Sequence, residues 1–202
     1  MTLQDLWLSV AYTALFAVVF GAIEFVKRRF GAPTEVMRRV AHMASGLLLI
    51  LDFYTLSPTV FVVLITGGGV LFYVLSQRKI FTSVNDVARR SVGQYVLTVG
   101  YLAAYGIAQF DMSVFIPSVL IITFADSLAG LYGTLIGAER RTIVGSAIFF
   151  AVALLVLVGA AGVAVLPAIA MAAALTLVER FTPLGFDNVS IPLVSALLLL
   201  AF

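Results

Sequence analysis

The chain has 202 residues, of which 62% are hydrophobic and 11% are charged. Its formal net charge of +2 is too small to indicate a nucleic-acid partner, and the absence of cysteine excludes disulfides and thiolate metal ligands. Several apolar runs approach the roughly 20 residues that a helix needs to cross a bilayer. We therefore expect an integral membrane protein rather than a soluble one.

Apolar stretches bounded by charged residues or by Pro and Gly predict about eight membrane-spanning helices, with seven as the alternative. The expected spans, in chain order, are 5–26, 41–57, 59–77, 92–109, 113–137, 143–160, 164–180 and 189–202. The division inside 143–180 is the least defined, because Gly159, Gly162 and Pro167 indicate a tight turn there. Runs of this length favour helices over the short alternating strands of a barrel. The expected fold is an all-α, polytopic transmembrane helical bundle that forms a single domain, 1–202.

Basic residues are confined to alternate connections between the expected spans. They fall in the odd-numbered loops or at the span ends beside them: Lys27, Arg28, Arg29, Arg38, Arg39, Arg78, Lys79, Arg89, Arg90, Arg140, Arg141 and Arg180. The loops near 52–57, 109–111 and 159–167 contain none. Because cytoplasmic loops accumulate Lys and Arg, this pattern predicts that every basic side chain is cytoplasmic and that both termini face outward.

The stretch EVMRRVAHMASG places acid, base and the chain's single histidine on one helix face. Glu35, Arg38, Arg39, His42 and Gly46 step by three and four residues. A guanidinium pair suits phosphate oxygens through bidentate hydrogen bonds, and a histidine can pass a proton near neutral pH. The structural alternative is that the arginines anchor the helix at the cytoplasmic surface.

An aspartate lies within the fifth expected span. A carboxylate at membrane depth costs roughly 2.5–3.5 kcal/mol, so such a residue is usually paired or lines a polar cavity. Asp126 shares a helix face with Gly130, Gly133 and Gly137. That glycine stripe admits another backbone or a ligand. The structural alternative is a packing seam of small residues, with Asp126 paired to a base.

The stretch AERRTIVGS connects this span to the next. Thr142, Gly145 and Ser146 offer hydroxyls and amides at a predicted helix N-terminus, which is a favourable position for an anion. Arg140 and Arg141 precede them and either bind that anion or anchor the span ends. The segment is a candidate phosphate site.

The stretch VERFTPLGFDNVSIP lies between the last two expected spans. Glu179, Asp187 and Asn188 supply carboxylate and carbonyl oxygens, which are the ligands that Mg²⁺ shares with substrate phosphates. The structural alternative is a polar turn around Pro183 and Gly185. This segment is the candidate metal site.

The predicted topology brings these four polar segments to one membrane surface. Bases, carboxylates and helix N-termini together suit a nucleotide with its magnesium ion. The surrounding bilayer would deliver a lipid substrate. We therefore expect a multi-pass membrane enzyme with one polar active site on the cytoplasmic side.

These motifs resemble those of the CTP-dependent polyprenol kinase family, which includes dolichol, phytol and farnesol kinases and a CTP-using diacylglycerol kinase. Phosphatidate cytidylyltransferase is similar more distantly. The family patterns, in order, are E-x-x-R-K-x-x-H-x-x-x-G, D-x-x-A-x-x-x-G followed by K-T/S-x-x-G-S, and E-(x)n-D-N-x-x-x-P. The matching residues are Glu35, Arg38, Arg39, His42, Gly46, Asp126, Ala129, Gly133, Gly137, Arg141, Thr142, Gly145, Ser146, Glu179, Asp187, Asn188 and Pro192.

The chain departs from the family pattern at a few positions. Arg39 and Arg141 stand where the family commonly has lysine, which keeps bidentate phosphate contact but not the compact charge of an ammonium. The link between Gly137 and Arg141 is shorter than in relatives. Ser127 and Gly130 occupy positions that are often glycine and acidic in phytol kinases, so a second carboxylate beside Asp126 is absent.

The resemblance implies transfer of the γ-phosphate of CTP to the hydroxyl of a membrane isoprenoid alcohol. It implies Mg²⁺ as cofactor, held by Asp126, Asp187 and Glu179. The nucleotide would be bound by Arg140, Arg141, Thr142, Gly145, Ser146, Asn188 and Gly133. The catalytic residues would be Arg38 and Arg39, which stabilise the transferring phosphoryl group, and Asp126 or His42, which acts as the base.

Two alternative functions remain open from the sequence. A cytidylyltransferase would use the same membrane site but would join CMP to a lipid phosphate and release pyrophosphate. A transporter of an anionic solute would favour inverted repeats, and none is visible. The chain length of the alcohol and the oligomeric state are not encoded in any motif that we recognise.

Overall fold

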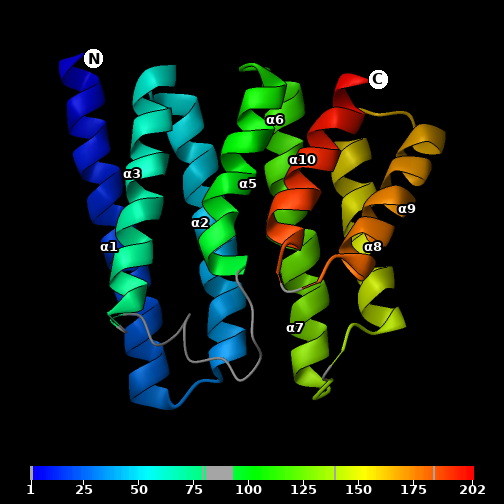
Figure 1. Ribbon diagram of the computed structural model, residues 1–202, viewed down its shortest axis with the longest axis horizontal. Helices are drawn as coiled ribbons and strands as arrows, with labels where there is room; N and C mark the ends of the chain where they lie inside the picture. The colour runs from blue at the N-terminus through cyan, green and yellow to red at the C-terminus, as the bar shows by residue number, and fades with distance from the viewer. Residues whose placement is uncertain (1, 79, 81–92, 139, 184) are drawn as a thin grey trace. The chain divides into compact units, whose positions relative to one another are not determined.

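The computed structural model describes residues 2–78, 80, 93–138, 140–183 and 185–202 (Figure 1). Over these ranges the chain forms eight helices, counting one that changes type along its length, and no strands. This confirms the predicted all-α class. The chain separates into two compact units, Met1–Arg89 and Arg90–Phe202, and each is described by itself.

The first unit contains α1 (Leu3–Phe30), α2 (Thr34–Thr55) and α3 (Pro58–Gln77). Helix α1 begins with a capping box, in which Thr2 and Asp5 each accept the other's backbone N–H. It ends at Gly31, whose φ of 66° is a left-handed conformation that glycine adopts without strain. Local sequence signals therefore define both ends of α1.

Aromatic side chains hold the first unit together. Phe16 and Phe20 of α1 stack with ring centroids 4.1 Å apart, and Phe72 of α3 meets Phe20 edge-on at 5.7 Å. Phe20, Ile23 and Ala41 form the buried centre between α1 and α2. A fully buried aromatic ring removes more apolar surface than any aliphatic side chain, so these rings dominate the packing of the three helices.

The helices of the second unit follow one another in the order α5 (Gly93–Ala108), α6 (Met112–Leu120), η1 (Ile121–Asp126), α7 (Ser127–Leu135), α8 (Ile143–Gly159), α9 (Val165–Phe181) and α10 (Asp187–Leu200). The segments α6, η1 and α7 form one continuous helix, Met112–Leu135, whose apolar window is 67% buried. It packs against α5, α8 and α10. This long helix is the centre of the second unit.

The middle of this helix is wound as a π-helix. Asp111 caps its start by accepting hydrogen bonds from the Ser113 hydroxyl at 2.6 Å and the Ser113 N–H at 2.8 Å, and these bonds lower the pKa of Asp111. Pro117 interrupts the regular pattern because it has no N–H to donate. The π-helical segment follows and ends at Asp126. Such segments are frequent at functional sites, and this one positions the central carboxylate of the unit.

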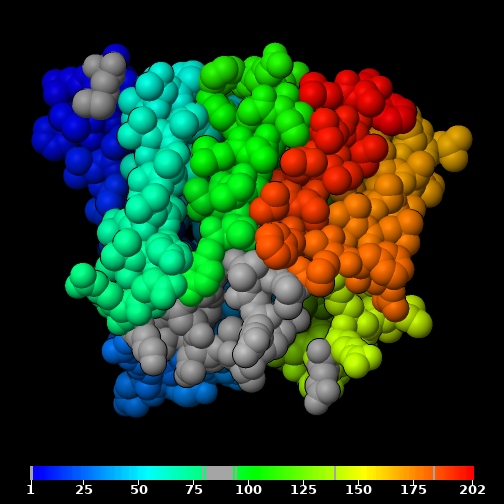
Figure 2. Space-filling view, in the orientation of Figure 1, coloured from blue at the N-terminus to red at the C-terminus, as the bar shows by residue number. Residues whose placement is uncertain are grey.

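Helices α5 and α10 pack directly against each other, as the space-filling view shows (Figure 2). They meet at Gly100, where a methyl group would overlap the backbone carbonyl oxygen of Asn188. Only glycine permits this approach. The start of α10 is therefore positioned by a residue of α5 that has no side chain.

The helices confirm the predicted elements, with differences at their ends. The second helix begins at Thr34, so it includes the helical turns predicted from Glu35 onward as well as the expected span 41–57. The fifth ends at Leu135 rather than 137, since Gly137 has a φ of 67°. The third loop, with Lys79, Arg89 and Arg90, lies outside the described residues, apart from Arg78 and Ile80.

Within the described ranges, three helices are long and apolar enough to cross a membrane: Leu3–Phe30, Pro58–Gln77 and Met112–Leu135. Three shorter apolar helices are Tyr95–Ala108, Ile143–Gly159 and Asp187–Leu200. These helices support membrane association. The number of spans, the orientation and the single domain over 1–202 stay predictions.

The predicted orientation can be tested by labelling, because the chain has no native cysteine. Arg29→Cys and Ala160→Cys replace exposed residues on predicted opposite sides of the membrane. In intact cells, a membrane-impermeant maleimide should label Ala160→Cys only, and both variants should react after lysis. Labelling of Arg29→Cys in intact cells would reverse the orientation.

The approach of α5 to α10 predicts different effects for two glycines of one helix. Gly100→Ala should destabilise the detergent-solubilised protein by about 1–3 kcal/mol, because the added methyl group forces the helices apart. Gly106→Ala is the matched control, since nothing lies within 4 Å of a methyl group there. Thermal unfolding followed by circular dichroism measures both. Equal melting temperatures would show that the contact at Gly100 is not tight.

Candidate functional site

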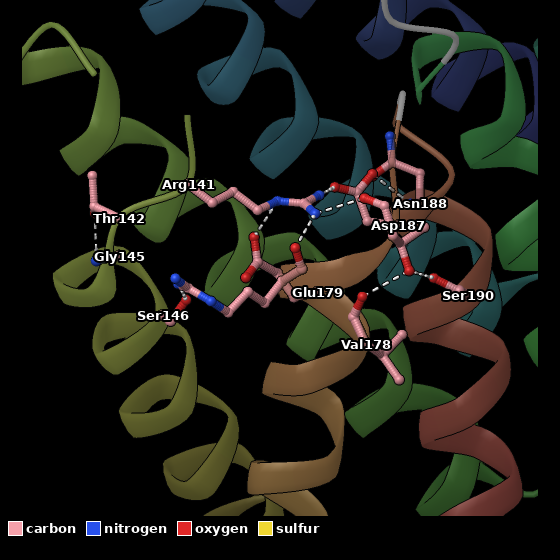
Figure 3. Close-up of polar contacts among 11 residues, drawn as sticks. Arg141, Thr142, Gly145, Ser146, Val178, Glu179, Asp187, Asn188 and Ser190 are labelled. Carbon is pink, nitrogen blue, oxygen red and sulfur yellow. Dashed lines mark hydrogen bonds and ion pairs between the residues drawn. The ribbon is translucent and has the colours of Figure 1, made fainter. Parts of the chain in front are cut away.

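The candidate site of the second unit centres on Arg141, in the connection between α7 and α8 (Figure 3). Its Nε lies 2.7 Å from Glu179 Oε1, and its Nη2 donates to Asp187 Oδ2. Its Nη1 donates to the backbone carbonyl oxygens of Arg180 at 3.1 Å and Thr182 at 2.6 Å. One guanidinium thus joins three segments of the chain.

These contacts bring hydrogen bonds and positive charge to groups that are buried or that end a helix. The last carbonyls of a helix have no intrahelical donor, and Arg141 supplies one at the end of α9. Glu179 is 4% exposed and Asp187 is 8% exposed. Buried carboxylates need a compensating charge and hydrogen bonds. Arg141 provides both, so it stabilises the join between α9 and α10.

The start of α8 has the geometry that the sequence predicts for a helix N-terminus. Thr142 is the N-cap residue, and its hydroxyl accepts the Gly145 N–H at 2.9 Å. Gly145 is buried, and a methyl group there would lie 3.0 Å from the Thr142 hydroxyl. At the next residue, the Ser146 hydroxyl accepts a hydrogen bond of 3.1 Å from Arg180 Nη1. The N-terminus of α8 and the C-terminus of α9 therefore lie together.

Helix α10 begins with the two polar residues of the third motif. Asp187 accepts the Asn188 N–H through Oδ1 at 3.1 Å, while its Oδ2 accepts from Arg141. The side-chain oxygen Oδ1 of Asn188 is buried and has no hydrogen-bond partner within the described ranges. The Ser190 hydroxyl lies 3.2 Å from that of Thr182. Asp187 and Asn188 thus present their oxygens at the end of α10 that Arg141 contacts.

Asp126 is buried at the last position of the π-helical segment, with 5% of its surface exposed. Thr123 and Ser127 lie on either side of it in sequence, and both are fully buried with hydroxyls that have no hydrogen-bond partner among the described residues. Positions three and four apart share a helix face. The interior of the second unit therefore contains a polar face around Asp126.

Two of the three glycines of the predicted stripe, Gly133 and Gly137, have different surroundings. No described atom lies within 4 Å of a methyl group placed at Gly133, so a tight packing seam is not seen there. Gly137 takes a left-handed conformation just beyond α7, and the N–H of Ala138 donates to Gly133 O at 2.9 Å. Gly137 therefore serves to end the helix.

The first unit contains the remaining predicted residues, on α2. Arg38 donates through Nε and Nη2 to one oxygen of Glu35, at 3.0 and 2.7 Å. Arg39 is buried and His42 is partly buried on the same helix. The predicted face of α2 is therefore formed, with Arg38 held by its acidic neighbour. The catalytic roles of these residues stay predictions.

The arrangement partly fits the predicted metal site. In the described ranges, no group of three or more histidine or acidic side chains is close enough to hold a metal ion, so Asp126 does not join Glu179 and Asp187 in such a group. Glu179 and Asp187 nevertheless share one cation, the Arg141 guanidinium. Magnesium is commonly bound by one or two carboxylates together with substrate phosphates. The residues that are present suit that mode.

Arg180 was not among the residues that the sequence pointed to for this site. Its side chain reaches Ser146, and its carbonyl oxygen accepts from Arg141. In the sequence it is a single basic residue at the end of an expected span, and the preference of such residues for the cytoplasmic side already accounts for it. Its position beside Glu179 was the available signal.

Taken together, the described residues define a helical, membrane-associated protein with a carboxylate and guanidinium cluster beside a helix N-terminus. The chain is similar to a phytol kinase of Synechocystis sp., with 29% identity over 216 residues that cover 96% of this chain and 91% of the relative. This similarity supports a polyprenol and phytol kinase-like family. No family model matches the chain. No solved structure matches it either.

The Arg141 cluster predicts a large effect on stability. Arg141→Met should lower the free energy of unfolding by about 3–5 kcal/mol, because it removes a guanidinium that pairs with two buried carboxylates. Adding Glu179→Gln should recover part of this loss by removing one of those charges. The measurement is SDS-induced unfolding of the detergent-solubilised chain.

Arg28→Met is the matched control for this prediction. Arg28 pairs with Glu24 at 2.7 Å, but its side chain is 62% exposed. Glu24 is buried, but solvent screens the exposed Arg28 guanidinium, so its removal should cost less than that of Arg141. If both methionine variants lose the same small amount, the cluster at Arg141 is not a stabilising element.

Proposed function

We propose that this protein is a kinase that transfers the γ-phosphate of CTP to the hydroxyl of a membrane isoprenoid alcohol of the polyprenol, phytol or farnesol type. The products are a lipid monophosphate and CDP. The observation that carries the proposal is the similarity to a phytol kinase along nearly the whole chain. The cluster of carboxylates and guanidinium groups beside the α8 N-terminus supports it.

The nucleotide side of the reaction uses one end of the second unit. The Thr142, Gly145 and Ser146 segment would receive phosphate oxygens at the α8 N-terminus, where the helix dipole favours negative charge. Arg140 and Arg180 lie beside that terminus in sequence or by contact and would add positive charge. Glu179 and Asp187 would hold Mg²⁺ together with phosphate oxygens of the nucleotide. A bound magnesium ion neutralises charge on the phosphates.

The acceptor side of the reaction uses a buried carboxylate. The alcohol oxygen forms a bond to the γ-phosphorus, and the bond from that phosphorus to the bridging oxygen of CTP breaks with its electron pair leaving on CDP. The transition state of such transfers is loose, so the hydroxyl proton needs to be accepted only late. Asp126 or His42 would accept it. Arg38 and Arg39 would stabilise charge on the transferring group.

A labelled-donor assay tests the proposal. The purified full-length chain, in lipid nanodiscs with Mg²⁺, is incubated with γ-labelled CTP, ATP, GTP or UTP and with a panel of lipid alcohols. The labelled γ-phosphate should be transferred from CTP to an isoprenoid alcohol. Asp126→Asn should reduce the rate about 100-fold or more, because the amide neither accepts the proton nor binds a cation as a carboxylate does.

Asp111→Asn is the control for the Asp126 variant. Asp111 belongs to the same long helix, is exposed at its start, and is replaced by an equally good N-cap residue. Its rate should stay within about twofold of the unchanged chain. If pyrophosphate is released and CMP is joined to the lipid, the protein is a cytidylyltransferase and not a kinase. No transfer from any donor would reject both.

A further inference from the structure

Arg141 occupies a position that its predicted role as a phosphate ligand does not explain. Four contacts use its Nε and both terminal nitrogens on groups of the chain itself. A guanidinium has five N–H donors, so little of its hydrogen-bonding capacity remains for a phosphate. In this arrangement Arg141 is a cation held between two acidic residues.

The oxygens around this cation suit a metal ion as well as a guanidinium. Glu179 and Asp187 both direct a carboxylate oxygen to Arg141. Asn188 follows Asp187 at the start of α10 (Figure 3), and its buried Oδ1 has no hydrogen-bond partner in the part of the chain that the structure describes. Two carboxylates and an amide oxygen are hard ligands of the kind that Mg²⁺ and Mn²⁺ prefer. The unpartnered amide oxygen is the independent sign that this cluster accepts a ligand.

Charge decides what happens when a divalent cation approaches these oxygens. The two carboxylates carry two negative charges, and Arg141 compensates one of them. A divalent ion compensates both, so the guanidinium and the ion compete for the same oxygens and repel each other at short distance. The two carboxylates therefore cannot bind the guanidinium and the divalent ion tightly at the same time.

We propose that Arg141 is the internal counter-cation of a divalent-cation site formed by Glu179, Asp187 and Asn188, and that binding of the ion displaces its guanidinium from the two carboxylates. Without the ion, Arg141 is a positioning residue that holds the ends of α9 and α10 together. With the ion bound, its guanidinium is released toward an anion. That this anion is a nucleotide phosphate rests on the proposed function.

The proposal predicts the sign of an effect on metal binding. Removing the competing charge should tighten binding of the ion, whereas loss of an ordinary supporting residue would weaken it. Arg141→Gln should therefore bind Mn²⁺ about tenfold more tightly than the unchanged chain, which corresponds to the loss of one charge-assisted interaction. Mn²⁺ should also raise the melting temperature of this variant more than that of the unchanged chain.

The experiment titrates Mn²⁺ into the full-length chain in detergent, without nucleotide or lipid, and follows free Mn²⁺ by electron paramagnetic resonance. Arg28→Gln is the matched control, because Arg28 also pairs with a glutamate but far from α10 in sequence. Its Mn²⁺ affinity should be unchanged. Asp187→Asn should weaken binding at least about tenfold if the ion occupies this site.

Arg141→Lys keeps the proposal testable if the glutamine variant fails to fold. Lysine retains one charge but loses the planar fork, so Mn²⁺ affinity should rise by a smaller factor, about threefold. Unchanged or weaker Mn²⁺ binding by the folded Arg141 variants overturns the proposal. So does tight binding that survives Asp187→Asn.

The outcome does not depend on the kinase assay. Tighter Mn²⁺ binding by Arg141→Gln together with no lipid labelling would reject the proposed function and keep the exchange of cations. Lipid labelling together with an unchanged Mn²⁺ affinity of Arg141→Gln would keep the proposed function and reject the exchange of cations.

Discussion

The second unit depends on a single guanidinium that is shared among groups from two helices. Arg141 joins the carboxylate of Glu179, the terminal carbonyls of α9 and the carboxylate of Asp187. Charged groups are buried at an acceptable free energy only where opposite charge and hydrogen bonds accompany them. Without this contact, two acidic residues at the junction of α9 and α10 would repel each other. The same contact brings the two carboxylates close together, at a position that favours a bound cation.

A close backbone contact between α5 and α10 also fixes the position of the first turn of α10. Gly100 lets α5 approach the backbone of Asn188 so closely that the first turn of α10 has little freedom to shift. The π-helical segment of the central helix packs against α8 and α10 and ends at Asp126. A reacting centre needs its groups held to within a fraction of an ångström. The helices supply this precision by close backbone contact.

Much of the secondary structure could be predicted from the sequence, because apolar length and helix-ending residues are local signals. Thr142 at a helix N-terminus was predicted from its residue type, whereas Gly137 was assigned to a glycine stripe and instead ends the helix in a left-handed conformation. The importance of Glu179 and Asp187 was also predictable, since acidic residues between apolar runs require a reason. The contact between Gly100 and Asn188 was not predictable, because its two partners are 88 residues apart and a glycine in a helix has many explanations. Arg180 was overlooked for a similar reason, as a base at a span end already had an explanation.

The sequence by itself determined the class of the protein, an all-helical chain suited to a membrane. It also determined which polar residues lie in apolar surroundings, where burial without a partner is unfavourable. Hydropathy and helix-capping act over a few residues, so they can be read along the chain. Only the tertiary structure decided which of those polar residues neutralise one another. The pairing of Arg141 with Glu179 and Asp187 spans about 40 residues of chain, and a basic residue near a predicted phosphate site can face either the ligand or the protein. Charge neutralisation depends on distance in space, which the order of residues does not specify.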